Sequence, residues 1–218
     1  MTAPVTIAHR AGNSYEALER ALADGVDAIE IDVRLERTHF AARHDGRVFF
    51  LPIYCGRWHA RFSLARAPDL DEVLRRVAGR ATLLVDVKST GTRALRLLLD
   101  LLKARGAIAG TRMSSPYWDL MRSARESEPE IRAYYSIGNA KELRRFWARQ
   151  QRTHEAEGVS IKASLLDKPL VDDFMREGIE IAAYNVYDLP RARELVAWGV
   201  AAVISGDLKV LRALKATT

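Results

Sequence analysis

A regular alternation of short apolar runs with amphipathic segments constrains the fold of this 218-residue chain more than any other feature. The apolar runs predict β-strands, and the helical spacing of apolar residues between them predicts helices. Seven of the strands are expected at residues 5–9, 28–33, 82–87, 131–137, 159–163, 179–186 and 201–205. One more, the fourth along the chain, is expected to end near residue 114. The helices are expected at residues 14–23, 69–77, 92–103, 117–127, 141–151, 169–177, 190–198 and 208–214. The chain therefore predicts eight strands and eight helices in turn.

Strict alternation of nearly continuous apolar strands with helices is typical of a parallel sheet covered by helices. Eight units of about 27 residues favour a closed (β/α)₈ TIM barrel over an open doubly wound sheet. The first strand is also not followed by the G-x-G-x-x-G motif of many open sheets. Since no Gly/Ser-rich or Pro-rich linker interrupts the pattern, we expect one barrel domain over residues 1–218. Leu35–Pro68 fits no unit and predicts a short insertion after the second strand, where barrel enzymes often bind substrates.

The amino-acid composition indicates the cellular compartment and the kind of partner to expect. With 34 Lys and Arg against 28 Asp and Glu, the formal charge is +6, which mildly favours anionic partners. No apolar stretch approaches the roughly 18 residues of a membrane-spanning helix, and the first residues do not resemble a secretory signal. A single cysteine, Cys55, cannot form an internal disulfide. We therefore expect a cytoplasmic protein without a transmembrane segment.

Polar side chains gather where the predicted strands end, and in a barrel these ends converge on one face. The first strand ends in His9-Arg10. The second strand carries Glu30 and Asp32, alternate residues that point to the same face of the strand. His44, followed by an aspartate, comes shortly afterwards along the chain.

The third strand adds a carboxylate and a cation, Asp86 and Lys88, again on one face. Burying Glu30, Asp32 and Asp86 together would cost several kcal/mol for each group unless a positive charge offsets them. Three carboxylates suit one hard divalent cation, Mg²⁺ or Ca²⁺. With Arg10 and Lys88 beside it, such a site could hold a phosphodiester.

Two histidines could then transfer the protons that cleavage of a phosphoester requires. Each feature also has a purely structural interpretation when taken alone. A single histidine at a strand end is often only a capping residue, Glu-x-Asp can lie on a solvated edge, and Asp86 and Lys88 could simply neutralise each other. Their combination on one predicted barrel face is what favours a catalytic site.

At these residues the sequence resembles the glycerophosphodiester phosphodiesterase family over nearly the whole chain. The resemblance is carried by the segments His9-Arg10, Ala23–Val33 (ADGVDAIEIDV), His44-Asp45, Pro68–Leu74 (PDLDEVL), Val85–Lys88 (VDVK), Ser114-Ser115, Ala183–Val186 (AYNV) and Gly199–Ser205. It implies a divalent metal held by Glu30, Asp32 and Asp86. It further implies substrate binding by Arg10, Lys88 and the aromatic wall of Tyr184, and an acid–base pair of His9 and His44. The implied reaction releases glycerol phosphate and an alcohol, after attack by water or by a neighbouring substrate hydroxyl.

The departures from the family pattern affect the substrate more than the chemistry. The loop after His9-Arg10 lacks the usual Pro-Glu-Asn, and Asp86 stands where most members have Glu. The usual Trp-Thr-Val-Asn is replaced by residues 184–187 (YNVY), and the carboxylate after the last strand is displaced by one residue to Asp207.

Two other functions stay open: a phospholipase D-like enzyme acting on lysophospholipids or sphingolipids, and a non-catalytic phosphate-ligand binder. A nucleic-acid partner is not expected, because the arginines are scattered over many helices instead of forming a stripe. Residues Arg57–Arg66 (RWHARFSLAR) alternate basic and aromatic side chains. They could recruit a second anionic group or bring about peripheral contact with an acidic membrane. The expected partner is a small phosphodiester, and the sequence assigns no oligomeric state.

Overall fold

The computed structural model describes residues 3–47, 53–55, 60–62 and 67–216. Eight parallel strands lie at the centre: β1 (Val5–Ala8), β2 (Ala28–Glu36), β7 (Thr82–Val87), β8 (Thr111–Ser115), β9 (Arg132–Ile137), β10 (Gly158–Lys162), β11 (Glu180–Tyr184) and β12 (Ala202–Ser205). Each pairs with its neighbours in chain order, and β1 pairs with both β2 and β12, which closes the sheet. The predicted (β/α)₈ barrel is confirmed.

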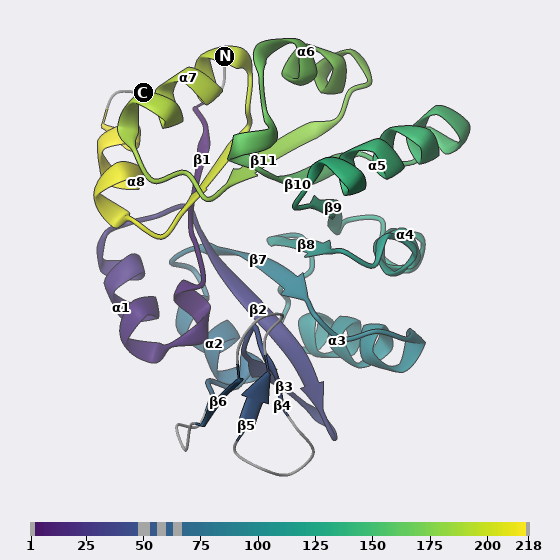
Figure 1. The fold of residues 1–218 in the computed structure, drawn as a ribbon. Helices are drawn as coiled ribbons and strands as arrows, with labels where there is room; N and C mark the ends of the chain where they lie inside the picture. The colour runs from purple at the N-terminus through teal and green to yellow at the C-terminus, as the bar shows by residue number, and fades with distance from the viewer. Residues whose placement is uncertain (1–2, 48–52, 56–59, 63–66, 217–218) are drawn as a thin grey trace.

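In the described part of the chain there are eight α-helices, and they surround the strands as a ring (Figure 1). They are α1 (Tyr15–Ala23), α2 (Leu70–Val77), α3 (Thr92–Ala104), α4 (Trp118–Ser127), α5 (Ala140–Thr153), α6 (Lys168–Arg176), α7 (Leu189–Trp198) and α8 (Leu208–Lys215). Five follow an Asn or Asp whose side chain accepts a hydrogen bond from a first-turn amide, and α1 follows Ser14, whose side chain accepts one from the Ala17 amide. None of the helices in the described ranges combines the length and apolar character needed to cross a bilayer.

The insertion after β2 contains more regular structure than its sequence indicated. β2 continues to Glu36 and pairs antiparallel with β3 (His39–Ala42). A small antiparallel sheet follows, formed by β4 (Gly46–Arg47), β5 (Ile53–Cys55) and β6 (Ala60–Phe62). The segment therefore leaves the barrel as a hairpin and returns to it at α2.

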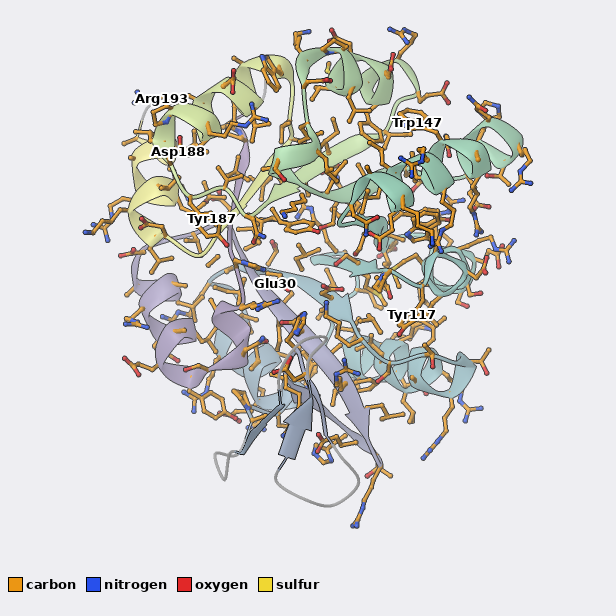
Figure 2. All side chains as sticks on the ribbon, in the orientation of Figure 1. Glu30, Tyr117, Trp147, Tyr187, Asp188 and Arg193 are labelled. Atoms are coloured by element: carbon orange, nitrogen blue, oxygen red, sulfur yellow. The ribbon has the colours of Figure 1, made fainter. Side chains whose placement is uncertain are left out.

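Two apolar layers hold the barrel together. The larger lies between the strands and the helices, and the smaller fills the barrel interior with Ile7, Ala28, Leu84, Tyr134, Ala182, Ala202 and Ile204. In Figure 2, Glu30 lies at the centre of the ring, whereas Tyr117 and Trp147 lie on its periphery. Burial of Glu30 to 4% exposure in such a setting requires a compensating interaction.

Candidate active site

The chain turns sharply where β1 ends, and this turn directs a main-chain amide at a carboxylate. Arg10 has a left-handed backbone (φ 55°), which is uncommon for a residue with a side chain. In this conformation its backbone N–H donates to Oε2 of Glu30 over 2.5 Å. The Arg10 side chain also reaches Asp32, with Nε 3.3 Å from Oδ2. The turn thus connects the first strand to both carboxylates of the second.

Strand register brings the three predicted metal ligands together. Asp32 on β2 lies directly opposite Asp86 on β7, and Glu30 is two residues earlier on the same face as Asp32. One carboxylate oxygen from each of the three residues lies within 4.8 Å of the other two. Lys88 lies beside the cluster, with Nζ 2.5 Å from Asp86 Oδ2 and 3.1 Å from Asp32 Oδ1.

Electrostatics divide the cluster into groups that resist ionisation and groups that keep their charge. Burial, reinforced by Asp32 and Asp86, raises the pKa of Glu30 well above its usual range. Burial also raises the pKa of Asp86, against the opposing effect of Lys88. For Asp32, burial is outweighed by Lys88 and Arg10, so its pKa is lowered. Two cations therefore do not fully neutralise the three carboxylates of the cluster.

A divalent cation fits this cluster. In the described structure, Oδ1 of Asp86 is buried and has no hydrogen-bond partner. A buried acceptor without a partner costs about 1–3 kcal/mol, and a cation would satisfy it. Oxygen donors alone, arranged around one point, are the ligand set that Mg²⁺ and Ca²⁺ prefer. The residues present are thus consistent with a hard cation held by Glu30, Asp32 and Asp86.

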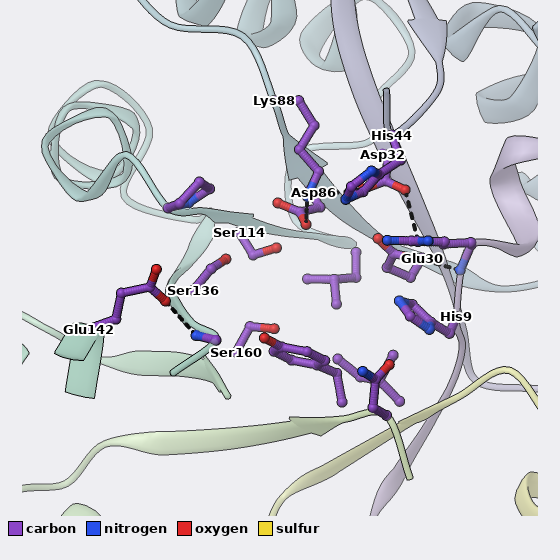
Figure 3. A pocket seen from close by; sticks show the side chains of 17 residues that line it. His9, Glu30, Asp32, His44, Asp86, Lys88, Ser114, Ser136, Glu142 and Ser160 are labelled. Carbon is purple, nitrogen blue, oxygen red and sulfur yellow. Dashed lines mark hydrogen bonds and ion pairs between the residues drawn. The ribbon is translucent and has the colours of Figure 1, made fainter. Parts of the chain in front are cut away.

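Both candidate histidines line the same cavity of about 240 Å³ (Figure 3). His9 is half-buried, and burial together with Arg10 lowers its pKa to about 4, so its ring is neutral at pH 7. His44 lies at the more exposed edge, with Nδ1 3.0 Å from Asp45 Oδ1. Tyr184, the last residue of β11, also lines the cavity, as the family resemblance implied. The cavity thus contains every predicted catalytic, substrate-binding and metal-binding residue.

Several residues that line the cavity, or that contact a residue lining it, were not predicted as site residues from the sequence. Asn13 fixes Asp32 twice: its Nδ2 donates to Asp32 Oδ2 over 2.7 Å, and its Oδ1 accepts from the Asp32 amide over 3.0 Å. The opposite wall consists of Ser136, Ser160 and Glu142, together with Ser114 of the family-like Ser-Ser pair. Serines within otherwise apolar strands were the available signal for this wall. Glu142 had no such signal, because it lies in the polar first turn of α5.

Arg34 connects two segments of the site and was also not predicted. Its Nε and Nη2 donate to the backbone carbonyl of His44 over 3.1 and 2.9 Å. Its Nη1 donates to the carbonyl of Lys88 over 3.3 Å. One guanidinium therefore holds the segment that carries a candidate acid–base group against the segment that carries a candidate phosphate ligand.

The remaining residues of interest either do not line this cavity or lie outside the described ranges. In the Arg57–Arg66 segment, residues 57–59 and 63–66 lie outside the described residues, so the structure does not address the proposed recruitment role. His39 is exposed. His154 is exposed too, but it has a partner that the sequence did not reveal, because its Nδ1 lies 3.3 Å from Glu177 Oε2.

Comparison with known proteins identifies the fold. No protein-family model matches the sequence, and no curated protein matches it. Solved structures do match. A provisionally named glycerophosphoryl diester phosphodiesterase from Agrobacterium tumefaciens has a TM-score of 0.83 at 11% identity, covering 99% of this chain and 98% of its own. A glycerophosphodiester phosphodiesterase from Parabacteroides distasonis has a TM-score of 0.75 at 20% identity, covering 99% of each chain.

A third similar structure is a phosphodiesterase from Oleispira antarctica, solved with the product sn-glycerol-3-phosphate. It has a TM-score of 0.75 at 20% identity, covering 98% of this chain and 97% of its own. Such identities establish a common fold. The chain therefore has the barrel fold of proteins named glycerophosphodiester phosphodiesterases, which confirms at the level of the fold the resemblance found in its sequence.

Proposed function

We propose that this protein is a divalent-cation-dependent phosphodiesterase that hydrolyses glycerophosphodiesters to glycerol phosphate and an alcohol. One observation carries the proposal: three carboxylate oxygens within 4.8 Å of one another face a cavity that also contains two histidines, an arginine and a lysine. A barrel that only binds phosphate has no need of two proton-transfer groups. The similar fold of the Oleispira antarctica phosphodiesterase, solved with glycerol phosphate, supports the same substrate class.

The cation would be held by Glu30, Asp32 and Asp86, and either Mg²⁺ or Ca²⁺ suits these oxygen ligands. When bound, it would polarise the phosphate and offset negative charge that develops on it. Arg10 and Lys88 would bind the phosphate oxygens from the same side of the cavity. Asn13 would keep the Asp32 carboxylate in one orientation through its two hydrogen bonds.

His9 is the better candidate for the base. Its lowered pKa leaves the imidazole neutral at pH 7 and able to accept a proton. It would take this proton from the attacking hydroxyl, of water or of the substrate glycerol, as the new P–O bond forms. His44, oriented by Asp45, would donate a proton to the alcohol oxygen as its bond to phosphorus breaks. If the substrate hydroxyl attacks, water opens the resulting cyclic phosphate in a second step.

The test is an assay of the purified protein with glycerophosphocholine and Mg²⁺ or Ca²⁺, in which released glycerol phosphate is measured. We expect turnover that a chelator abolishes and added cation restores. His9→Ala should lower kcat by about 10²–10⁴-fold, the usual contribution of a positioned acid or base. The matched control is His39→Ala, which removes an exposed histidine outside the cavity and should leave kcat unchanged.

Bound cation without product from any glycerophosphodiester would contradict the proposal. In that case, product from lysophospholipids would identify a phospholipase D-like enzyme, and no product from either class would identify a phosphate-ligand binder. We also propose a cytoplasmic location, because the single cysteine cannot form an internal disulfide.

A further inference from the structure

Glu142 is a negative charge in the cavity wall that the proposed reaction does not use. It lies in the first turn of α5, and Figure 3 shows it across the cavity from His9, beyond Ser136 and Ser160. In the part of the chain that the structure describes, no Lys or Arg forms an ion pair with it. We propose that Glu142 and Tyr184 form a subsite for a positively charged alcohol group, so that the preferred substrate is a glycerophosphodiester of an amino alcohol. This inference rests on the proposed phosphodiesterase function.

The charges that line the cavity support this assignment. A divalent cation with Arg10 and Lys88 supplies four positive charges, and the three carboxylates with one phosphodiester supply four negative ones. His44, when protonated, has Asp45 as its own partner 3.0 Å away. Glu142 therefore leaves one negative charge that these groups do not match. A substrate with an ammonium group on its alcohol would supply the missing positive charge.

The geometry around Gly138 brings two suitable recognition groups together. The Gly138 amide donates to Glu142 Oε2 over 2.6 Å, which fixes the carboxylate and leaves Oε1 for a ligand. A methyl group added at Gly138 would lie 3.0 Å from the Tyr184 hydroxyl and 3.3 Å from Glu142 Oε2, so both groups converge on this glycine. A carboxylate beside an aromatic ring attracts ammonium groups through charge and through the ring face.

The wall between Glu142 and the carboxylate cluster is suited to the rest of such an alcohol. Ser136 and Ser160 are direct register partners on β9 and β10, and both line the cavity. Oγ of Ser136 is buried and, among the described residues, has no hydrogen-bond partner. A short polar chain that ends in an ammonium group could therefore bond this hydroxyl on its way to Glu142.

If Glu142 had only a structural role, an uncharged side chain of the same shape could perform it. The bond from Gly138 fixes the start of α5 in the manner of a helix-capping glutamate, and a glutamine makes the same bond. Glu142→Gln therefore keeps the cap and removes only the charge. The matched control is Glu126→Gln, which removes an exposed negative charge on α4 outside the cavity.

The experiment compares kcat/KM for glycerophosphoethanolamine and glycerophosphoglycerol, which differ in the charge of the alcohol. Wild type and Glu126→Gln should prefer the ethanolamine diester, and added salt should reduce this preference. Glu142→Gln should lower kcat/KM for the ethanolamine diester by about tenfold, the effect of one charged hydrogen bond, and leave the glycerol diester unchanged. Its melting temperature should match that of wild type.

Two results would overturn the inference while leaving the phosphodiesterase function intact. One is a wild-type enzyme that hydrolyses both diesters equally at low salt, a comparison that needs no variant. The other is an equal loss on both diesters in Glu142→Gln. Failure of the wild type to cleave any glycerophosphodiester would instead contradict the proposed function itself.

Discussion

A divalent cation should stabilise the folded protein, because the carboxylate cluster is incompletely neutralised without one. Glu30 and Asp32 are 4% and 1% exposed, and Asp86 has a buried oxygen with no partner in the described structure. Burial, reinforced by repulsion from Asp32 and Asp86, already raises the pKa of Glu30. The unfolded chain separates these groups and should bind the cation weakly. Binding should therefore shift the equilibrium toward the folded state.

The size of the shift follows from mass action. A cation at 100 times its dissociation constant stabilises the fold by about 2.7 kcal/mol. In a chain of this length, each kcal/mol raises Tm by about 2–4 °C, which predicts a rise of roughly 5–10 °C. Thermal unfolding would be followed first with a chelator and then with increasing Mg²⁺ or Ca²⁺ at constant ionic strength.

Two variants distinguish cation binding at the carboxylate cluster from a general effect of ions on the stability of the protein. Asp86→Asn keeps the size of the side chain but removes one ligand charge, so the cation-dependent rise should largely disappear. Asp172→Asn, a change in a partly exposed residue on α6 that does not line the cavity, should retain the full rise. A wild-type Tm that responds to neither cation at millimolar concentration, or a rise that persists unchanged in Asp86→Asn, would refute the assignment of the site.

Two other predictions concern positioning and packing. Arg34→Lys keeps the positive charge, but one amine cannot hold both backbone carbonyls that the guanidinium bonds. From the loss of one or two hydrogen bonds we expect kcat to fall about tenfold, Tm to fall by only a few degrees, and the cation affinity to stay unchanged. A fall in Tm that accounts for the lost activity would mean that Arg34 is only structural. Gly158→Ala would place a methyl group 2.0 Å from Cδ1 of Tyr134, and should destabilise the barrel by about 1–3 kcal/mol in urea unfolding. Gly110→Ala, whose added methyl would meet its nearest neighbour at 3.9 Å, is the control and should unfold like wild type.

The barrel itself was predictable because its determinants are local and repeated. Each β-like run is continuous and apolar, and most of the predicted helices begin beside a capping side chain, so the element boundaries differ from the structure by only a few residues. The insertion was different. Its strands are two to four residues long, too short to show a periodicity that a sequence window could detect. β3 pairs with β2, and the other three strands pair among themselves.

The candidate site was predictable where charged residues lie on neighbouring strands, and less so where a residue acts through hydrogen bonds to a distant segment or from a helix. The alternation of Glu30 and Asp32 fixes their common face, and the barrel places Asp86 beside them. Asn13, in the turn after β1, bonds Asp32, which is 19 positions away. Arg34 lies on β2, but it bonds the carbonyls of His44 and Lys88, 10 and 54 positions away, and these bonds depend on how the partner segments fold. Glu142 reaches the cavity only because of the way α5 packs.

The acid–base pair is the central claim, and a double-mutant cycle of His9 and His44 tests it most directly. Each single alanine variant should lower kcat for a glycerophosphodiester by about 10²–10⁴-fold. Since the two rings would act on one substrate as a unit, the double variant should lose little more than either single variant. All three variants should still show the cation-dependent rise in Tm. Normal turnover in either single variant, or losses that simply multiply in the double variant, would contradict the proposal that His9 and His44 act together in one active site.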